Sequence, residues 1–383
     1  MEFLFWISNA FIIYTYAGYP ALLFVIAKLF PAPAVMKADI RPKVTILIAA
    51  HNEEKCIKKT IENKLSLDYP QDKIEIRVVS DASVDMTNEI VSGFKNKGVV
   101  LDVIKNRGGK LNAINKGAAK AKGEIIVFCD ANTIFKKDNL QKLTRNFNDK
   151  NVVCVNGEKR MLSARNMGGP GEGFYWTYES FIRTYESLSC GGLIAVDGSN
   201  FAVRKSVYPF PAVEAVGADV AIVWELLKRG HKSVYEPQAI AFEEPCADIK
   251  DEFKRKSRII STGYNAVRKN KVLLNPFRSK ESCLQSWKIL SHRFLKWQVP
   301  YFLIVLFISN IFLTPISGYR YLLFLQILFY VGSVVGYILY KNNVNSKFFL
   351  ILLSVVLGNA AAVAGLMKFL TGRSEIIWRS PAR

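Results

Sequence analysis

The sequence predicts an α/β domain held between membrane-spanning helices, and two observations lead to this prediction. Apolar residues make up 50% of the 383 residues, but they gather in four long uncharged runs near the two ends of the chain. Between these runs, short β-branched segments alternate with helical segments, which is the pattern of a parallel α/β sheet. The chain therefore divides into a central folded domain and flanking membrane segments.

The four apolar runs are each about as long as a helix that crosses a hydrocarbon core of roughly 30 Å. The first run lacks a positive leading region and is too long for the apolar core of a signal peptide, which indicates a retained anchor. The segment before the second run mixes aromatic, apolar and basic residues, as in an interfacial helix anchored by Trp287, Arg293 and Trp297. The runs cover residues 3–27, 297–319, 321–340 and 348–367. We expect an anchor at 1–30, the α/β domain at 31–280, an interfacial amphipathic helix at 281–298, C-terminal transmembrane helices at 299–371 and a tail at 372–383.

The placement of Lys and Arg predicts the orientation of the chain in the membrane. Basic residues follow the first anchor, and the loop at 341–347 is also basic, so we expect the central domain in the cytoplasm of a plasma-membrane protein. Three C-terminal crossings would leave the basic tail outside, against the rule. This conflict is resolved if one of the last three runs is re-entrant or interfacial. The basic residues after the first anchor are Lys28, Lys37, Arg41 and Lys43, and those of the tail are Arg373, Arg379 and Arg383.

The net charge of +20 fits either nucleic acid or an anionic membrane surface with an anionic ligand. Many of the cations crowd into residues 250–280, just before the membrane runs, which favours anionic lipid and a diphosphate over nucleic acid. A solvated basic helix face is the alternative. The six cysteines form no CxxC pair and no zinc spacing, which fits a reducing compartment.

The central region predicts strands whose ends carry polar side chains. Ligands of a parallel α/β sheet bind at the carboxyl ends of the strands, and polar residues stand there at 51–53, 80–81 and 130–132. Neither GxGxxG after the first strand nor GxxxxGK[ST] occurs, which disfavours a dinucleotide oxidoreductase and a P-loop enzyme. We expect strands at 44–50, 74–80, 99–104 and 124–130, and helices at 53–67, 85–95, 110–121 and 220–229.

Five residues are candidates for chemistry, each with a structural alternative. Asp130 and Asn132 follow an apolar strand and could bind Mg²⁺ or Mn²⁺ through oxygen, or simply form a turn. Asp81 could accept hydrogen bonds from a nucleoside or cap the next helix. Lys110 follows two glycines at a helix start, where it could contact phosphate or lie in solvent. Asp219 opens a helix as a general base or as a cap.

A sixth candidate is Arg258, which stands in the basic stretch before the membrane runs. Its guanidinium could hold a phosphate or the oxygens of an acceptor. The structural alternative is that it belongs only to the solvated basic face.

Taken together, these segments resemble family 2 glycosyltransferases of the membrane polysaccharide-synthase type, which include cellulose, chitin and hyaluronan synthases. The resemblance covers nearly the whole chain, and its strength lies in the order of the segments between membrane runs. The matching segments are Ala49–Glu54 (NE), Ser80–Ser83 (DDGS, with Ser80 for the first Asp), Gly109–Asn115 (GKxxALN), Asp130–Asn132 (DxD, with Asn for the second Asp), Asp197–Arg204 (G[TS]xxAxR), Gly217–Asp219 (ED) and Gly230–Ala239 (GxxxxYxPxA).

The resemblance implies a GT-A fold, a UDP-sugar donor, Mg²⁺ or Mn²⁺ and inversion at the anomeric carbon to give a β-glycosidic bond. It implies that Asp219 is the base and that Asp130 and Asn132 bind the metal. The acceptor would be a glycan or a lipid-linked glycan, bound beside Gly198, Ser199 and Asn200. The residues it assigns to the nucleotide sugar are Ala50, Asn52, Glu53, Asp81, Lys110, Asp130 and Arg258.

One departure from the family pattern bears on whether the chain transfers a single sugar or extends a polymer. Processive synthases carry Q-x-x-R-W, whereas this chain has Arg255-Lys256-Ser257-Arg258-Ile259 and so lacks the Gln and the Trp. Their loss favours a single transfer to a lipid-linked acceptor, while the C-terminal membrane helices also fit a polymer synthase, as a homo-oligomer or with a partner. A catalytically inactive membrane subunit and a transporter are the alternatives outside this class.

Overall fold

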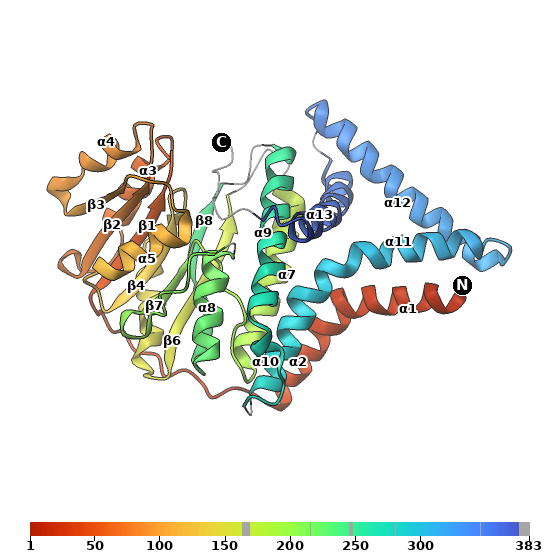
Figure 1. Ribbon diagram of the computed structural model, residues 1–383, viewed down its shortest axis with the longest axis horizontal. Helices are drawn as coiled ribbons and strands as arrows, with labels where there is room; N and C mark the ends of the chain where they lie inside the picture. Colours follow the sequence, from red (N-terminus) through yellow and green to blue (C-terminus); the bar gives the residue numbers. More distant parts are fainter. Residues whose placement is uncertain (163–168, 215, 245–247, 280, 345, 375–383) are drawn as a thin grey trace.

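The central domain is built on one eight-stranded mixed sheet (Figure 1). The computed structural model describes residues 1–162, 169–214, 216–244, 248–279, 281–344 and 346–374. The strand order is β3-β2-β1-β4-β7-β6-β8-β5. The strands are β1 (Val44–Ala50), β2 (Ile74–Asp81), β3 (Val99–Ile104), β4 (Ile125–Asp130), β5 (Ile134–Phe135), β6 (Val152–Met161), β7 (Phe201–Arg204) and β8 (Lys232–Glu243).

The pairing pattern brings the ends of six strands to one edge of the sheet. β3, β2, β1 and β4 are parallel, as the alternating sequence pattern predicts. β7 runs antiparallel to both β4 and β6, and β6 is parallel to β8, so β4, β6 and β8 all point the same way. The carboxyl ends of β4, β6 and β8 therefore meet at the edge where ligands of α/β sheets bind.

Each face of the sheet is covered by helices that bury an apolar stripe against it. Ile46 and Ile48 of β1 face one core, and Leu47 and Ala49 face the other, because successive side chains of a strand alternate. The first core is closed by α3 (Ile57–Leu65), α4 (Thr87–Ser92) and α6 (Asn139–Thr144), and the second by α5 (Lys110–Lys120) and α8 (Ala218–Lys228).

The strands begin and end within one residue of their expected positions, but the helix expected from residue 53 begins only at Ile57. The preceding residues are held as a loop by the segment after β2. The backbone N–H of Glu53 donates to Thr87 Oγ1 at 2.8 Å, and that of Glu54 donates to Asp85 at 3.1 Å. These tertiary bonds satisfy donors that a helix start would otherwise leave unpaired.

Within the described residues, four helices are long and apolar enough to cross a membrane. Their outward apolar side chains remain exposed, for example 74% for Phe3 and 63% for Phe324, as expected of groups that contact lipid. The first passes from α1 (Glu2–Ile13) through a π-helical turn at Tyr14–Gly18 into α2 (Tyr19–Leu29). The second begins as α10 (Ser282–Lys288) and continues through a π-helical segment, η7 (Ile289–Leu295), into α11 (Lys296–Phe312). The third is α12 (Ser317–Lys341), and the fourth is α13 (Lys347–Leu370).

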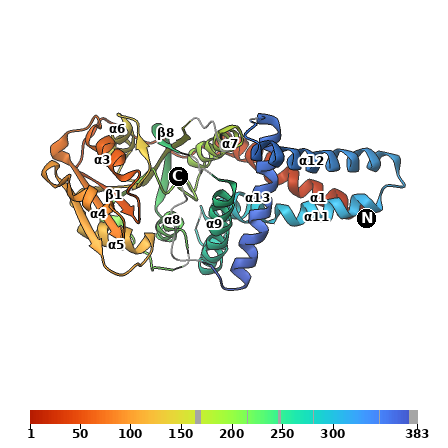
Figure 2. The same ribbon diagram turned by 90° about the horizontal axis from the view of Figure 1, so that it is seen from above.

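The helix α13 differs from the other three in its direction. In Figure 1 it is seen nearly end-on, and in Figure 2 it runs across the direction shared by α1, α11 and α12. It packs along α9 (Ile249–Lys269), where a Cβ on Gly365 would lie 2.8 Å from Ile260 Cγ2 and 3.0 Å from the backbone oxygen of Ser257. The close approach of these helices needs a glycine at this position.

The expected interfacial helix at 281–298 is not a separate element, because α10, η7 and α11 follow one another without a break. Two of its expected membrane anchors also contact the protein. Trp287 Nε1 donates to the Tyr14 hydroxyl at 2.8 Å, and the Trp297 ring lies 4.9 Å from the ring of Tyr264. Both side chains remain partly exposed, so their role as membrane anchors stays a prediction.

Candidate active site

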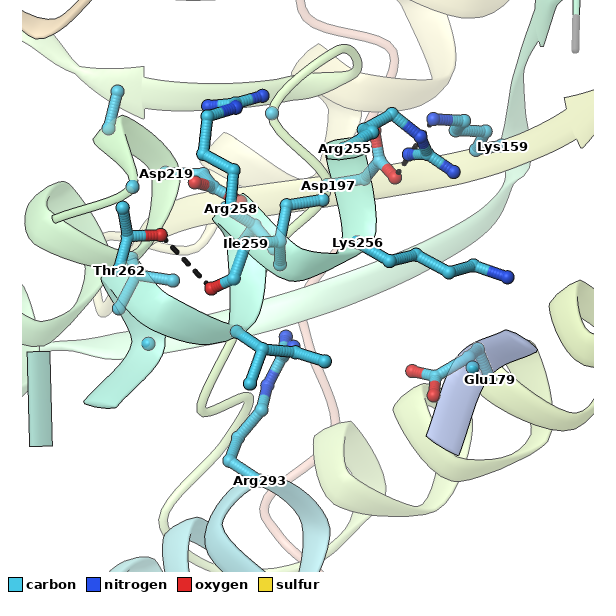
Figure 3. Close-up of a pocket in the computed structure, with 18 of the residues that line it drawn as sticks. Lys159, Glu179, Asp197, Asp219, Arg255, Lys256, Arg258, Ile259, Thr262 and Arg293 are labelled. Carbon is cyan, nitrogen blue, oxygen red and sulfur yellow. Dashed lines mark hydrogen bonds and ion pairs between the residues drawn. The ribbon is translucent and has the colours of Figure 1, made fainter. Parts of the chain in front are cut away.

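A cavity of about 1440 Å³ lies between the carboxyl edge of the sheet and a wall of helices (Figure 3). The sheet side consists of strand ends, the loops after them and the starts of α5 and α8. The helix side consists of α7 (Gly169–Leu188), α9, the η7–α11 segment and α13. Several of the site residues proposed from the sequence line this cavity. They are Glu53, Lys110, Asp130, Asn132, Gly198, Asp219 and Arg258.

Lys110 and Asp130 form an ion pair on the sheet side of the cavity. Asp130 ends β4, and Lys110 opens α5 after Gly109, whose φ of +87° strongly favours glycine. Withdrawal from water raises the pKa of Asp130, Lys110 opposes this rise only in part, and Glu243 adds a smaller rise. Withdrawal from water would lower the pKa of Lys110, but Asp130 outweighs it and raises that pKa. Lys110 is thus held as a cation where phosphate would bind.

Asp81 lies behind the cavity wall and not in it. The side chain is fully buried, and its two carboxylate oxygens accept the N–H groups of Gly108 and Gly109, each at 2.8 Å. Asp81 therefore fixes the turn that aims Lys110 at the cavity. Each oxygen has one backbone partner and keeps a second acceptor site, so the contact with nucleotide that the sequence predicts stays a prediction.

Two other residues expected at the nucleotide also lie outside the cavity lining. Ala50 is fully buried in the core of the sheet, and its neighbour Ala49 reaches the cavity. Asn52 has a φ of +54°, and its side-chain oxygen accepts the N–H of Val84 at 2.9 Å. Asn52 therefore ties the loop after β1 to the loop after β2.

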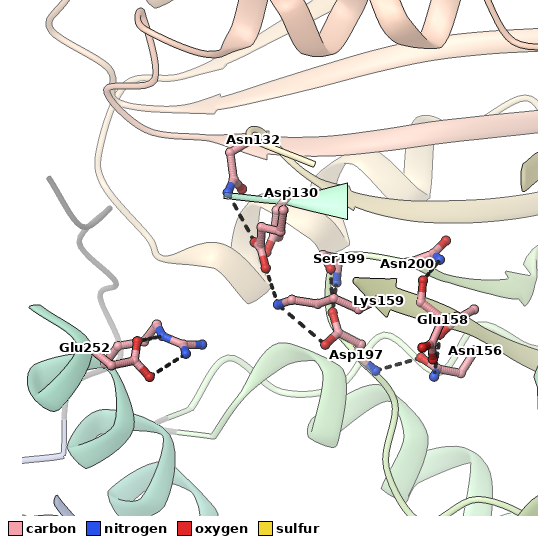
Figure 4. Close-up of polar contacts among 12 residues, drawn as sticks. Asp130, Asn132, Asn156, Glu158, Lys159, Asp197, Ser199, Asn200 and Glu252 are labelled. Atoms are coloured by element: carbon pink, nitrogen blue, oxygen red, sulfur yellow. Dashed lines mark hydrogen bonds and ion pairs between the residues drawn. The ribbon is translucent and has the colours of Figure 1, made fainter. Parts of the chain in front are cut away.

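A network of charged side chains joins the ends of β6 and β8 to the loop before β7 (Figure 4). Lys159 of β6 forms ion pairs with Glu243 of β8 and, at 3.6 Å, with Asp197. The amide nitrogen of Asn132 donates to Glu243 at 3.2 Å. Burial would raise the pKa of Asp197, but Lys159, Arg183 and a hydrogen bond from Ser199 together lower it to about 2. Asp197 is therefore a fixed anion and is unsuited to act as a base.

The residues at the ends of β4 and β8 fit a divalent cation only with help from a ligand. Among the described residues, no three His, Cys, Asp or Glu side chains come together as a ready metal site. Asp130 and Asn132 both line the cavity. Mg²⁺ is commonly held by one or two carboxylates together with the phosphates of its substrate. The pair thus fits a metal that arrives with, or is completed by, a diphosphate.

Asp219 lies in the first turn of α8, across from Lys110. A side chain on Gly198 would begin 3.5 Å from the Asp219 Cβ and 3.5 Å from Lys110 Nζ, so the missing side chain leaves space between these two groups. Arg258 projects from α9 into the same cavity (Figure 3). Asp219 and Lys110, which come from two different helices, therefore flank Gly198.

Ser199 and Asn200 do not line this space, although the sequence placed them at the acceptor. Ser199 is 1% exposed and donates to Asp197, and Asn200 is fully buried and donates to the backbone oxygen of Ala239 at 2.8 Å. Both side chains position the loop that carries Gly198. Of the three residues expected at the acceptor, only Gly198 lies at the cavity wall.

Sequence reasoning missed most of the helix side of the cavity and part of the sheet side. Lys159 and Glu243 could have been found as charged residues at the ends of strands, had β6 and β8 been recognised. The aromatic and charged residues of α7 gave no local signal, because only the tertiary fold turns them toward the sheet. The missed lining residues include Lys159, Trp176, Glu179, Arg183, Asp197, Glu243, Arg293 and Lys296.

Comparison with known proteins gives one family match and several relatives. Residues 45–208 match the family model of glycosyl transferase family 2. A probable glycosyltransferase, YdaM of Bacillus subtilis, is 30% identical over 234 residues, or 57% of this chain and 54% of that protein. Poly-β-1,6-N-acetyl-D-glucosamine synthase of Staphylococcus aureus is 29% identical over 206 residues, or 52% of this chain and 49% of that protein. The match to this chain thus spans about half the length of both curated relatives.

A solved structure with the same fold is the mannosyltransferase PcManGT from Pyrobaculum calidifontis, in complex with GDP-Man and Mn²⁺. It superposes with a TM-score of 0.69 over 97% of this chain and 99% of that chain, at 21% sequence identity. The likeness therefore includes the long apolar helices as well as the sheet.

Proposed function

Because the chain carries a glycosyl transferase family 2 domain on a GT-A fold, we propose that it moves a sugar from a nucleoside diphosphate donor to a glycan or lipid-linked acceptor at a membrane. The observation that carries the proposal is the convergence of Lys110, Asp130 and Asp219 around Gly198 at the carboxyl edge of the sheet. The long apolar helices and the polysaccharide synthase among its relatives support the membrane setting.

The donor diphosphate would bind at the ends of β1 and β4. Lys110 supplies a positive charge beside the start of α5, whose free N–H groups also favour anions. Asp130 and Asn132 would hold Mg²⁺ or Mn²⁺, which supplies positive charge to a leaving diphosphate when bound. The Mn²⁺ in PcManGT supports a divalent metal here. Glu53, which lines the cavity next to Asp130, would face the nucleotide.

The acceptor hydroxyl would be activated by Asp219. Its carboxylate lies in the first turn of α8, on the cavity wall beside Gly198, within reach of a hydroxyl bound there. Attack from the side opposite the diphosphate inverts the anomeric centre, so an α-linked donor gives a β-glycosidic bond. Arg258, which lines the same cavity, would hold acceptor or donor oxygens and keep them oriented.

We favour a UDP-sugar as donor and a single transfer over processive synthesis. Ile259 lines the cavity at the position where processive family members carry a Trp, so the aromatic surface for a growing polymer end is missing there. The alternative is extension of a polysaccharide, which is the activity that the S. aureus relative is named for.

The direction of α13 supports a specific membrane arrangement. If α1–α2, α11 and α12 cross the bilayer and α13 lies along its inner surface, the N-terminus is outside and the catalytic domain is cytoplasmic (Figure 2). The basic tail then also lies inside, in agreement with the distribution of Lys and Arg. The same arrangement places the helix side of the cavity at the membrane surface.

The test is turnover of nucleotide sugars by the full chain in lipid nanodiscs, with Mg²⁺ or Mn²⁺, comparing UDP- and GDP-sugars. Released nucleoside diphosphate and product size are measured, with and without lipid extract. Asp219→Asn should lower transfer about 10²–10⁴-fold, because the base is lost, while nucleotide binding stays unchanged. Glu225→Gln, on the outer side of the same helix, should leave transfer unchanged. A fully active Asp219→Asn variant, or no metal-dependent turnover with any donor, would refute the proposal.

A further inference from the structure

We propose that the helix side of the cavity binds the phosphate of a lipid-linked acceptor, whose hydrocarbon chain lies along α13. This inference deepens the proposed glycosyl transfer and rests on it. It assigns Arg183, Arg258 and Arg293 to the acceptor phosphate, and it places the reacting hydroxyl of the same acceptor at Asp219.

The first observation is that charge is segregated between the two sides of the cavity. Among the described lining residues, the sheet side has six carboxylates and two lysines, whereas the helix side has two carboxylates and eight Lys or Arg residues. The sheet-side charges are Glu53, Asp130, Asp197, Glu214, Asp219, Glu243, Lys110 and Lys159. The helix-side charges are Glu179, Asp251, Arg183, Lys254, Arg255, Lys256, Arg258, Arg293, Lys296 and Lys368.

The carboxylates nearby neutralise only part of this positive charge. On α9, Lys254 pairs with Asp251 at 3.4 Å, and Arg255 pairs with Glu252 at 2.8 Å. On α11, Lys296 pairs with Glu179 at 2.6 Å. Arg293, in contrast, forms no ion pair with any carboxylate in the described part of the chain, and in Figure 3 it rises from η7 into the cavity.

Arg183 provides a second, independent observation. The residue is 5% exposed and lies against the ring of Trp176 at 5.5 Å, which fixes its guanidinium at the cavity wall. Its Nη1 is buried and has no hydrogen-bond partner within the described structure. A buried guanidinium nitrogen without an acceptor is costly, and a phosphate oxygen would satisfy it.

Most of the surface that α13 adds to the helix side is apolar. Besides Lys368 near its end, α13 contributes Ile351, Val355, Gly358 and Ala362 to the lining. Two polar residues of this surface are satisfied within the helix: Ser354 donates to the backbone oxygen of Leu350 at 2.8 Å, and Asn359 donates to that of Val355 at 2.9 Å. A hydrocarbon chain can therefore lie on α13 while a phosphate faces α7, α9 and η7.

The basic residues and the apolar surface of α13 together favour a phosphorylated lipid over a neutral glycan as the bound acceptor. A neutral glycan would leave Arg293 without an ion pair, whereas Arg binds phosphate through two parallel hydrogen bonds. The donor diphosphate does not explain Arg183 and Arg293, because its expected place is at Lys110 and Asp130 on the sheet side. An acceptor with a phosphate, a lipid chain and a hydroxyl would span the two sides.

The transfer step balances with the groups present. The acceptor hydroxyl oxygen forms a bond to the anomeric carbon of the donor sugar and gives its proton to Asp219. The bond from that carbon to the donor's β-phosphate oxygen breaks, and its electron pair leaves with the nucleoside diphosphate. The acceptor phosphate only binds, so it appears unchanged in the product.

The test measures binding of geranylgeranyl phosphate to the full chain in phosphatidylcholine nanodiscs. Trp176 and Trp297 line the cavity and report binding by a change in fluorescence. Geranylgeraniol lacks the phosphate, and inorganic phosphate lacks the hydrocarbon chain. Each should bind at least about tenfold more weakly than geranylgeranyl phosphate. Arg293→Ala should weaken binding of the lipid phosphate about tenfold to a hundredfold, and Arg293→Lys should weaken it less.

Arg268→Ala is the matched control, because it removes the same charge from α9 outside the cavity. It should bind the lipid phosphate as the wild type does, and nucleotide binding should be equal in all variants. Equal binding of geranylgeraniol, an unchanged affinity in Arg293→Ala, or full competition by nanodiscs containing phosphatidylglycerol would overturn the inference. If the lipid phosphate binds as expected while no nucleotide sugar is turned over, the proposed function fails and the lipid site stands.

Discussion

The two sides of the cavity differ in charge, in construction and in their distance along the chain. The sheet side is acidic and is built mainly from strand ends and the turns after them, in a sheet whose strands β1 and β4 are almost wholly buried. The helix side is basic and is assembled from four segments, starting at Gly169, Ile249, Ile289 and Lys347. The sheet side therefore suits invariant chemistry on a nucleotide sugar, and the helix side suits selection of the acceptor next to the membrane.

The largest effect that separates the two sides should come from Asp130→Asn. Loss of this charge removes the carboxylate of the expected metal site, so transfer should fall at least about 10²-fold and donor affinity should drop, without a change in lipid-phosphate binding. Initial rates over a series of Mg²⁺ and Mn²⁺ concentrations would measure this. Asp72→Asn, on an exposed 3₁₀ turn, is the control. A variant that keeps the wild-type metal dependence would remove Asp130 from the metal site.

A second, intermediate effect concerns Asp197, which interacts with Lys159 on the sheet side and Arg183 on the helix side. Its pKa of about 2 lies below the unfolded value of about 3.8, so the ionised group stabilises the fold by about 2 kcal/mol. This stabilisation is present at neutral pH and is lost as the pH falls from about 4 toward 2. Asp197→Asn should therefore lower the thermal midpoint by several degrees at pH 7.

The pH series is the check on that prediction. The difference in midpoint between Asp197→Asn and the wild type should be constant from about pH 8 to pH 5 and should shrink below about pH 4. Asp72→Asn should show no comparable difference at any pH. A gap that grows on acidification would mean that Asp197 is not the low-pKa anion that joins the two sides.

The same contrast explains what could be predicted from the sequence. β1 and β4 are short apolar runs followed at once by polar residues, so local pattern was sufficient to place Asp130 and, with the two glycines, Lys110 at one edge. Asp81 was placed correctly at a strand end, yet its carboxylate turns inward to Gly108 and Gly109. A pattern locates a side chain on a strand but does not show which neighbour takes its hydrogen bonds.

The helix side could not be predicted in this way. Arg293 was expected to anchor an interfacial helix, and its approach to Arg258 and α7 depends on long-range packing of α9, η7 and α13. The conflict between three C-terminal crossings and the basic tail was the one sequence signal that pointed to the unusual direction of α13. That signal concerns topology, so it could not identify the residues that α13 places against the cavity.

The smallest expected effect tests whether α13 holds the helix side in place. In Gly365→Ala, the new Cβ would stand 2.8 Å from Ile260 Cγ2 and 3.0 Å from the Ser257 oxygen, so α13 must shift by a few tenths of an ångström from α9. The KM for a lipid-linked acceptor should rise about two- to fivefold, because remote packing positions the acceptor, while donor hydrolysis in the absence of acceptor should not change. Gly318→Ala on α12, where the added Cβ meets nothing within 4 Å, should change neither. An equal loss of donor hydrolysis in Gly365→Ala would show that the two sides are not mechanically separate, since a disturbance at α13 would then reach the strand ends.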